Sequence, residues 1–282
     1  MLRFNKGIYG LKQSGLQWNK TITQVFETLG FEQSRYDPCF FFVRDRSSNA
    51  LKTFIVLFVD DILCASVDQE LLNQVKRNLS ERFQMALLGV PSRYLGLELH
   101  RNAAGIFVNQ TQFIDELLAK YNMTKAAPQY TPMSQRPTAT GPDDEPFDVR
   151  SMREIVGSLL FLSGFTRPDI ACAVSHLARH QAKPSKQHFT LAKRILRYLI
   201  GTRTLSLCFP AKPSPALLCF CDADYAGDED SRKSINGFVF TLGGTPLMWM
   251  SMRQTSVALS TTEAEYALSL LQLSKPCIFK VF

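Results

Sequence analysis

Two adjacent carboxylates, Asp60 and Asp61, stand where two apolar runs meet, 53–59 and 62–67. A buried strand does not normally end in a pair of like charges without compensation. A divalent cation supplies that compensation, and Mg²⁺ is bound through carboxylates and often through substrate phosphates. The alternative is a tight turn with two exposed aspartates, because Asp is a favoured turn residue. The strand–Asp-Asp–strand pattern alone leaves both interpretations open.

A second acidic set lies near the end of the chain. Asp222 ends an apolar stretch that predicts a strand, Asp224 shares its face, and Glu265 falls in the first turns of a predicted final helix. A strand-end aspartate that faces a helical glutamate is typical of the carboxylate cluster of a two-metal nuclease. The alternative for Asp222 is a turn residue, and Glu263 is explained by a capping box with Ser260.

Other kinds of chemistry have less support. His176 and His180 are four residues apart, but no third ligand follows and the glutamate of a protease motif is absent, so we expect solvated or phosphate-contacting histidines. The seven cysteines include no CxxC pair, which argues against a disulfide framework and a zinc site. No GxxxxGK, GxGxxG or GxSxG segment supports a nucleotide hydrolase, a dehydrogenase or an esterase.

Length and composition indicate a globular protein of about two domains, with 282 residues, 45% of them hydrophobic and 20% charged. No apolar run reaches the roughly 18 residues that span a membrane. The N-terminus lacks the apolar core of a signal peptide. We therefore expect an intracellular protein that is not secreted and has no membrane partner.

The positive charge is concentrated in one segment. The net charge is +7, and basic residues crowd one predicted helix and its approach: Lys183, Lys186, Lys193, Arg194 and Arg197, with Arg203 beyond. Such a cluster suits a phosphate backbone, but one solvated helix face would look the same. The charge therefore permits a nucleic-acid partner without requiring one.

Hydrophobic periodicity predicts both helices and strands. We expect helices at 15–29, 68–83, 111–123, 152–165, 170–181, 188–200 and from 261, and strands at 40–43, 53–59, 62–67, 93–100, 105–109, 217–222, 237–242 and 247–251. Asp68 and Thr111 are the expected N-caps of their helices. Five prolines fall within 126–150, where no period survives, and this segment is the expected linker.

A series of segments resembles, in order, the reverse transcriptase and ribonuclease H region of a copia-type retrotransposon polyprotein. The matching segments are Lys6–Ser14 followed by Trp18, Phe58–Asp61, Tyr94–Leu99, Gly157–Leu162 with Thr166–Ile170, Arg194–Leu199, Asp222–Asp228, Arg232–Ser234 and Ala258–Tyr266. The Asp-Asp motif alone is weak evidence, whereas the ordered series is strong.

The resemblance implies an α+β fold in four parts. These are a partial polymerase palm and thumb at 1–125, a linker at 126–150, a connecting helical region at 151–205 and a partial ribonuclease H-like α/β domain at 206–282. It also implies Mg²⁺-dependent phosphoryl transfer. The implied partners are an RNA template, a DNA primer strand and an RNA–DNA hybrid, in the cytoplasm or in a retroelement particle.

The resemblance also assigns roles to individual residues. Asp60 would hold the catalytic metals with help from Asp61, and Asp222 and Glu265 would be metal ligands of the nuclease. The implied nucleic-acid contacts are Lys12, Gln13 and Ser14 at the template and incoming nucleotide, Leu95 and Gly96 at the primer end, and Arg194 and Arg197 along the phosphates.

The chain departs from the family pattern at both sites. In the family, the first polymerase aspartate lies upstream of the segment that matches Lys6–Ser14, and none of the eight residues before Tyr9 is acidic. The nuclease part normally continues to a third metal-binding aspartate, and this chain stops at Phe282. We therefore expect both sites to be incomplete, Mg²⁺ binding to be weak or lost, and the chain alone to catalyse neither reaction.

Two alternatives stay open. One is a non-catalytic nucleic-acid-binding protein derived from a retroelement, which keeps the fold without its metal chemistry. The other is a product with no stable fold, because a palm without its first strands exposes a sheet edge.

Overall fold

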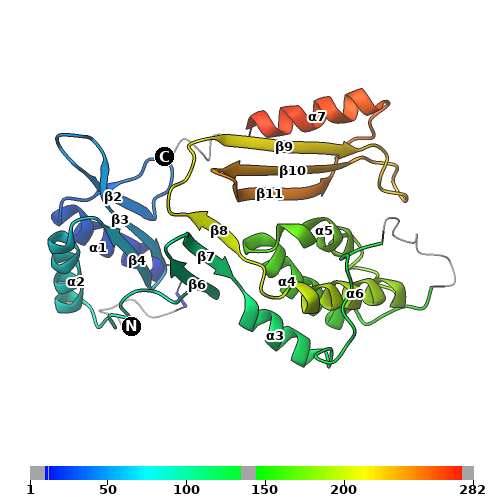
Figure 1. Cartoon of the computed structure of the whole chain (residues 1–282), viewed down its shortest axis with the longest axis horizontal. Helices are drawn as coiled ribbons and strands as arrows, with labels where there is room; N and C mark the ends of the chain where they lie inside the picture. The colour runs from blue at the N-terminus through cyan, green and yellow to red at the C-terminus, as the bar shows by residue number, and fades with distance from the viewer. Residues whose placement is uncertain (1–9, 12, 135–143, 275–282) are drawn as a thin grey trace, which may run out of the picture. The chain divides into compact units, whose positions relative to one another are not determined.

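The structure, a computed structural model, describes residues 10–11, 13–134 and 144–274. It divides into two compact units, one containing the described residues up to Gly89 and the other Val90–Leu273 (Figure 1). Both units contain helices and strands, which confirms the α+β class. The boundary at Gly89 lies ahead of the segment 126–150 that the composition favours. The division into palm, thumb, connecting and nuclease parts stays a prediction.

The first unit contains a four-stranded antiparallel sheet in the order β1-β2-β3-β4. Aromatic and β-branched residues fill β2 and β3, where such side chains pack well on a pleated surface. Five elements lie within two residues of their predicted positions: α1 (Ser14–Thr28), β2 (Phe40–Arg44), β3 (Leu51–Phe58), β4 (Asp61–Ser66) and α2 (Gln69–Arg82). The short strand β1 (Glu32–Gln33) was not predicted.

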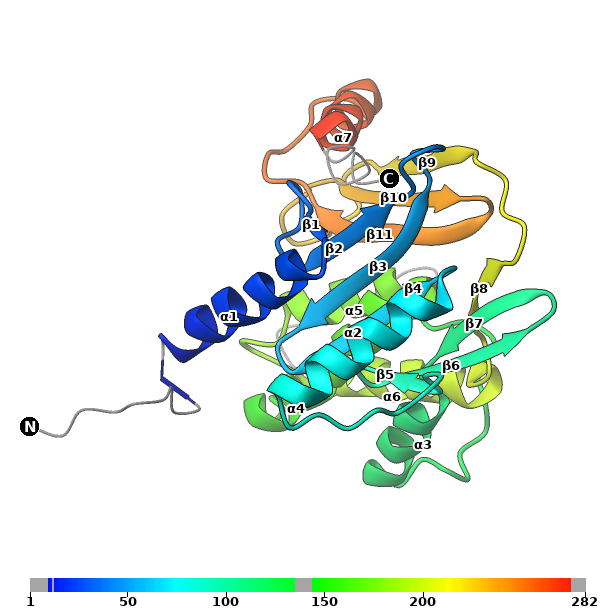
Figure 2. The ribbon, with the colours of Figure 1, turned by 90° about the vertical axis from the view of Figure 1, so that its left-hand side faces the viewer.

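The two faces of this sheet differ because side chains alternate along each strand. Phe41 and Ile55 are buried on the face that α1 and α2 cover (Figure 2). Residues paired across neighbouring strands share a face. The pairing of Phe58 with Asp61, and of Phe54 with Ala65, therefore places Phe58 and Asp61 on the other face, which is less deeply buried.

The second unit begins with an antiparallel sheet in the order β5-β6-β7-β8. The strands β6 (Leu97–Asn102) and β7 (Gly105–Asn109) form the predicted hairpin. The single strand predicted at 93–100 is wrong, because a turn at Leu95 and Gly96 separates β5 (Arg93–Tyr94) from β6. The strand β8 (Leu207–Pro210) reaches β7 from beyond the helices and was not predicted. It is short and ends in proline, a residue that cannot donate to a sheet ladder.

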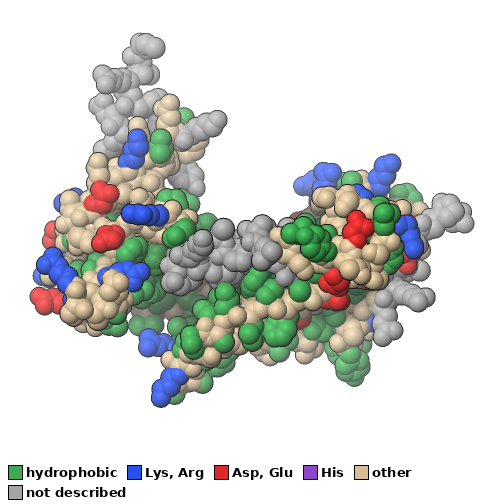
Figure 3. Space-filling model, turned by 90° about the horizontal axis from the view of Figure 1, so that it is seen from above, with side chains coloured by type: hydrophobic (Ala, Val, Ile, Leu, Met, Phe, Trp, Pro, Cys, Tyr) green, Lys and Arg blue, Asp and Glu red, His purple; other side chains and the backbone are tan. Residues whose placement is uncertain are grey.

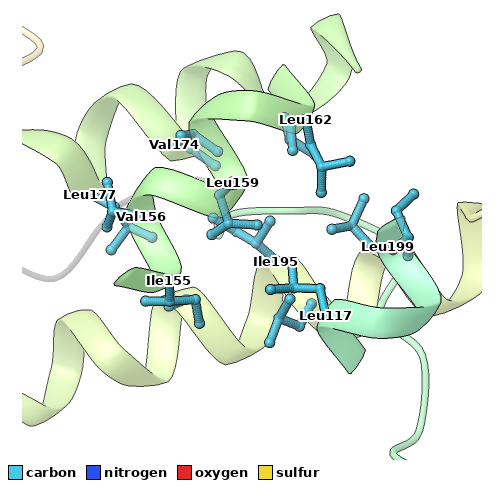
Figure 4. Close-up of a cluster of buried hydrophobic side chains, with 14 of the residues drawn as sticks. Leu117, Ile155, Val156, Leu159, Leu162, Val174, Leu177, Ile195 and Leu199 are labelled. Carbon is cyan, nitrogen blue, oxygen red and sulfur yellow. The ribbon is translucent and has the colours of Figure 1, made fainter. Parts of the chain in front are cut away.

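Helices form the larger of two hydrophobic cores within the described residues. They are α3 (Thr111–Lys120), α4 (Val149–Phe165), α5 (Ala171–Arg179) and α6 (Lys186–Thr202), with the 3₁₀ turn η1 (Pro168–Ile170) before α5. Figure 4 shows Leu117, Ile155, Leu159 and Ile195 pointing toward one another. Apolar residues at spacings of three and four produce these buried stripes, as the sequence predicts.

A three-stranded antiparallel sheet in the order β11-β10-β9 completes the second unit. Its strands are β9 (Leu217–Asp224), β10 (Ile235–Leu242) and β11 (Thr245–Arg253), and α7 (Thr261–Ser274) follows. In Figures 1 and 2, α7 lies on one side of this sheet and α5 on the other. Because β9 is paired on one side only within the described residues, it is an edge strand.

One of the two predicted N-caps is confirmed and one is wrong. The Asp68 carboxylate accepts hydrogen bonds from the first backbone N–H groups of α2, as an N-cap does. Thr111 is instead the first residue of α3, and its hydroxyl donates to Asn109 and to the backbone of Arg203. The carboxylate of Glu98, on the neighbouring strand, accepts from an early N–H of this helix, so a local cap is not required.

The surface of the described part carries scattered apolar side chains. Figure 3 shows hydrophobic surface between Lys, Arg, Asp and Glu side chains on one face. Phe220 on β9 is 61% exposed and Tyr266 on α7 is 66% exposed. Of the helices that the structure describes, none is long and apolar enough to cross a membrane.

Replacing glycine by alanine should have opposite effects on stability at two positions of the second unit. A Cβ at Gly105 would lie 2.1 Å from the carbonyl O of Phe209, whereas a Cβ at Gly157, inside α4, meets nothing within 4 Å. We expect Gly105→Ala to lower the free energy of unfolding by roughly 1–3 kcal/mol or more. Gly157→Ala should raise it by about 0.5–1 kcal/mol, because alanine is the better helix former. Chemical denaturation measures both, and equal effects would contradict the β7–β8 pairing.

Candidate functional site

The segment Val59–Asp61, called the acidic turn below, consists of the two-residue turn that joins β3 to β4 and the first residue of β4. Phe58 pairs with Asp61, so only Val59 and Asp60 form the turn. Among these two, φ is positive only at Val59, where it is +52°, and this is the pattern of a type II′ turn. The first position of such a turn favours glycine. Both carboxylates are exposed, so a tight turn presents the two acids to solvent.

The acidic turn fits Mg²⁺ as a partial ligand set. Carboxylate oxygens are the ligands that Mg²⁺ prefers, and Mg²⁺ usually takes only one or two of them together with waters and substrate phosphates. Neither Asp60 nor Asp61 forms an ion pair with another described residue. No group of three or more His, Cys, Asp and Glu side chains in the described segments could hold a metal ion. The pair would therefore supply two ligands of a site.

The start of α1 lies beside the acidic turn. Lys12, one of the three predicted template contacts, lies outside the described residues. Gln13 is the exposed N-cap of α1 and Ser14 its first residue. One helical turn later, Nε1 of Trp18 donates a hydrogen bond of 2.6 Å to the carbonyl O of Val59. The structure thus brings the Gln13–Ser14 segment and the acidic turn into one region, although their roles stay predictions.

The turn at Leu95 and Gly96 connects β5 to β6. Its φ values are +51° and +79°, and Tyr94 pairs with Leu97, as in a type I′ turn. A Cβ at Gly96 would lie 3.3 Å from the ring of Phe161 on α4, so glycine lets this turn approach the helix closely. The predicted contact with the primer end is not tested by this geometry.

The structure brings the predicted nuclease glutamate to the backbone of β9 next to Asp222. Asp222 is exposed near the end of β9, and Glu265 is half-buried on α7. Oε1 of Glu265 accepts a hydrogen bond of 3.0 Å from the backbone N–H of Ala223, the residue after Asp222. This bond uses one carboxylate oxygen and orients the other. A metal role for either residue stays a prediction.

An open pocket of about 490 Å³ lies between the β9–β11 sheet and α5. Asp222 and Asp224 line it from the sheet, and His176 and Arg179 line it from α5. Trp249 contributes an aromatic part of the wall. The pocket therefore combines acidic, cationic and apolar side chains in one accessible space.

A buried carboxylate holds the loop after β9 against α5 and β11. Asp228 is only 5% exposed and forms ion pairs with Arg253 at 2.7 Å and with Arg179 at 3.4 Å. Burial would raise the pKa of Asp228, but hydrogen bonds from Ser231 and Arg253 and the charges of both arginines outweigh burial and lower it to about 2. Asp228 is thus ionised and structural.

Three histidines form a row of neighbouring rings (the histidine row) beside this ion pair, and the second pair of rings is stacked. The rings of His176 and His180 are 5.0 Å apart, and those of His180 and His188 are 4.3 Å apart. Burial and then the positive charge of Arg179 lower the pKa of His176 to about 4. Burial is also the main cause that lowers the pKa of His180 and of His188. The neutral forms are therefore favoured in the folded state.

The two predicted phosphate-tracking arginines hold a chain segment in place. Nη2 of Arg194 donates to the hydroxyl of Thr131 at 2.8 Å, and Nε of Arg197 donates to the carbonyl O of Ala127 at 2.6 Å. Both side chains are half-buried on α6. They pack residues 127–131 along the helix, a role that the charge pattern did not predict. Contact with nucleic acid by their remaining donors stays a prediction.

Comparison with known proteins shows the family to which the chain belongs. Residues 1–135 match the family model described as reverse transcriptase (RNA-dependent DNA polymerase). The chain is 36% identical over 274 residues to the retrovirus-related Pol polyprotein from transposon TNT 1-94 of Nicotiana tabacum, covering 94% of this chain and 20% of that relative. It is 37% identical over 265 residues to that from transposon RE1 of Arabidopsis thaliana, covering 94% and 18%. No solved structure matches the chain.

A shorter relative is covered almost throughout. The transposon Ty5-1 protein of Saccharomyces cerevisiae is 32% identical over 263 residues, which is 92% of this chain and 84% of that protein. The chain is therefore a member of the reverse transcriptase family. Within that family it belongs to the copia-type retrotransposon Pol polyproteins, as the ordered motifs predicted. It spans about a fifth of the length of the longer relatives.

Sequence patterns did not identify every residue that shapes the site. Trp18 was predicted as part of a helix and of a matching segment, but not as a contact of the acidic turn, which its indole N–H reaches. Asp228 was seen only as part of a motif, and its arginine partners lie 49 and 25 residues away in the chain. No local spacing rule joins such distant residues, so the sequence contains no pairwise signal for these contacts.

The histidine row predicts that stability changes with pH. Because the pKa of His176 is about 4 in the folded state and its ordinary value is 6.5, the unfolded chain takes up a proton first as pH falls. The contribution of neutral His176 to the free energy of unfolding is therefore fully present above pH 6.5 and is lost as pH falls from about 6.5 to 4. We expect His176→Gln to reduce the pH dependence of the free energy of unfolding of the second unit over this range. His100→Gln, an exposed change on β6, is the control, and equal profiles for both variants would refute the prediction.

Proposed function

We propose that this chain is the part of a retrotransposon RNA-directed DNA polymerase that carries the Asp60–Asp61 metal motif. The observation that carries the proposal is the two-residue turn, which presents two adjacent exposed carboxylates without ion-pair partners among the described residues. Membership of the reverse transcriptase family supports the reaction class. The reaction is phosphoryl transfer from an incoming nucleotide to a primer on an RNA template.

In this proposal the chain's residues act mainly by positioning. Mg²⁺, when bound, would polarise phosphate oxygens and neutralise charge that develops during transfer. Asp60 would hold the metal and Asp61 would assist. Leu95 and Gly96 would contact the primer end through their backbone, and the positions before α1 would lie near the template.

We further propose that the second unit includes a ribonuclease H region. The support is the hydrogen bond that brings Glu265 to the residue following Asp222. These carboxylates would bind metal and act on the RNA strand of an RNA–DNA hybrid. The chain covers about a fifth of the Pol polyproteins from TNT 1-94 and RE1, so in this proposal complete activity belongs to a longer protein.

The alternative function is non-catalytic binding of nucleic acid. The net charge of +7 favours it. Phosphate contacts of this kind weaken steeply with salt. Salt-sensitive binding of an RNA–DNA hybrid that does not change with Mg²⁺ or with Asp60→Asn would support this alternative over the polymerase.

Removal of one carboxylate from the acidic turn should weaken metal binding. We expect Asp60→Asn to lower the affinity of the purified chain for Mn²⁺, a paramagnetic substitute for Mg²⁺, by about tenfold or more, because one of two charged ligands is lost. Electron paramagnetic resonance titration measures free Mn²⁺ directly. Glu81→Gln, an exposed change on α2, removes the same charge elsewhere in the unit. If both variants bind Mn²⁺ equally, the acidic turn is not the site.

The expectation that the chain alone performs neither reaction has a direct test. The purified chain should incorporate no labelled nucleotide on a primed RNA template and leave the RNA of a hybrid intact. The assay needs Mg²⁺, a primed template and the Asp60→Asn and Asp222→Asn variants as references. Incorporation that Asp60→Asn abolishes would disprove the expectation for the polymerase while supporting the proposed role of the turn.

A further inference from the structure

The acidic turn has a backbone conformation that its sequence does not favour. Val59 is β-branched and has φ of +52°, which places it in the left-handed region. That region is unfavourable for such residues because the branched Cβ crowds the backbone. Without an external constraint, the turn would therefore relax into other conformations. Any relaxation would move Asp60, which follows Val59 directly.

One side chain outside the hairpin contacts the strained residue. Nε1 of Trp18 donates a hydrogen bond of 2.6 Å to the carbonyl O of Val59. That carbonyl belongs to the peptide group whose nitrogen is the backbone N of Asp60. Because a peptide group is planar, fixing the carbonyl direction fixes the N–H of Asp60 as well. The hydrogen bond therefore acts on the peptide that precedes the first carboxylate.

The indole itself is held in place by packing. Its ring meets the ring of Phe83 edge to face, with centroids 5.1 Å apart and an interplanar angle of 76°. Trp18 also packs against the hydrophobic core of the first unit. An aromatic ring that packs against a hydrophobic core and donates from its edge has few alternative orientations. The hydrogen bond is consequently made from a fixed point on α1.

We propose that Trp18 is a positioning residue for the acidic turn, holding Val59 in its left-handed conformation and so orienting Asp60 and Asp61. The inference rests on the proposed function in one respect, that the turn binds a divalent cation. It adds the element that keeps the two carboxylates in one arrangement. Since Trp18 lies one helical turn from Ser14, it also links the start of α1 to that arrangement.

The test uses Trp18→Phe, which removes the N–H donor and retains an aromatic ring against Phe83. Tyr36→Phe is the control, because it changes an exposed aromatic side chain of the first unit outside the acidic turn and outside the pocket. We expect Trp18→Phe to weaken Mn²⁺ binding about three- to tenfold, in line with the loss of one hydrogen bond and freer turn geometry. Tyr36→Phe should leave Mn²⁺ binding unchanged.

A second change separates positioning from general stabilisation. Val59→Gly allows a positive φ without steric cost, so the turn should no longer depend on the indole. In the Val59→Gly background, Trp18→Phe should change Mn²⁺ affinity by less than about twofold. An equally large effect of Trp18→Phe in both backgrounds would overturn the positioning role.

Hydrogen exchange tests the proposal without metal. Trp18→Phe should accelerate exchange of the amides of residues 57–62, while those of β2 keep their rates. Uniform acceleration across the first unit, or no acceleration, would overturn the proposal. In the unmodified chain, NMR should show that the indole proton of Trp18 exchanges more slowly than an exposed indole proton. Free exchange of that proton would overturn the proposal even if the variant does not fold.

The two hypotheses fail in different ways. If Asp60→Asn does not weaken Mn²⁺ binding, the metal role of the turn is wrong, and the exchange data alone decide whether Trp18 holds the turn. If Asp60→Asn weakens binding but Trp18→Phe changes neither affinity nor exchange, the metal site stands and the positioning role of Trp18 is wrong.

Discussion

The register of the β3–β4 hairpin determines which side chains the first unit buries and where its charges stand. A shift of one residue would exchange the two faces of each strand. Two contacts on the helix-covered face oppose such a shift. The hydroxyls of Thr53 and Ser66 lie 2.6 Å apart in a hydrogen bond, and Ile55 pairs with Cys64. In this register only two residues remain for the turn, so an aspartate must occupy its tip and another the first position of β4.

Local periodicity predicted most of the helices and strands, because each of them has one face to bury. The apolar stripe of α4 is visible in the sequence before any partner is known, and so is the alternation in β3. The strand β8 was missed because it is four residues long and its pairing with β7 joins distant parts of the chain. The predicted cap at Thr111 failed for a related reason, since Glu98 on another strand satisfies that helix end.

The sequence predicted the carboxylates of the candidate site better than the residues that hold the surrounding segments in place. Asp60 and Asp61 were identified by charge between two apolar runs, and Glu265 by a carboxylate that capping does not explain. The arginines of α6 show the limit of this reasoning. Their charge suggested phosphate contacts, whereas their hydrogen bonds hold residues 127–131, because a guanidinium group also satisfies neutral backbone and hydroxyl acceptors. Charge pattern alone does not distinguish these acceptors.

The acids of this protein are positioned in two different ways. Asp228 is held by the opposite charges of Arg179 and Arg253, which occupy its oxygens. A carboxylate fixed in that way has little capacity left for a metal ion. Asp60 and Asp61 have no cationic partner in the described segments, and like charges so close together repel each other. Within the described segments, the backbone sets their arrangement through the sheet register below the turn and the strained residue beside it. Carboxylates held by peptide geometry keep their lone pairs, and these are what a cation binds.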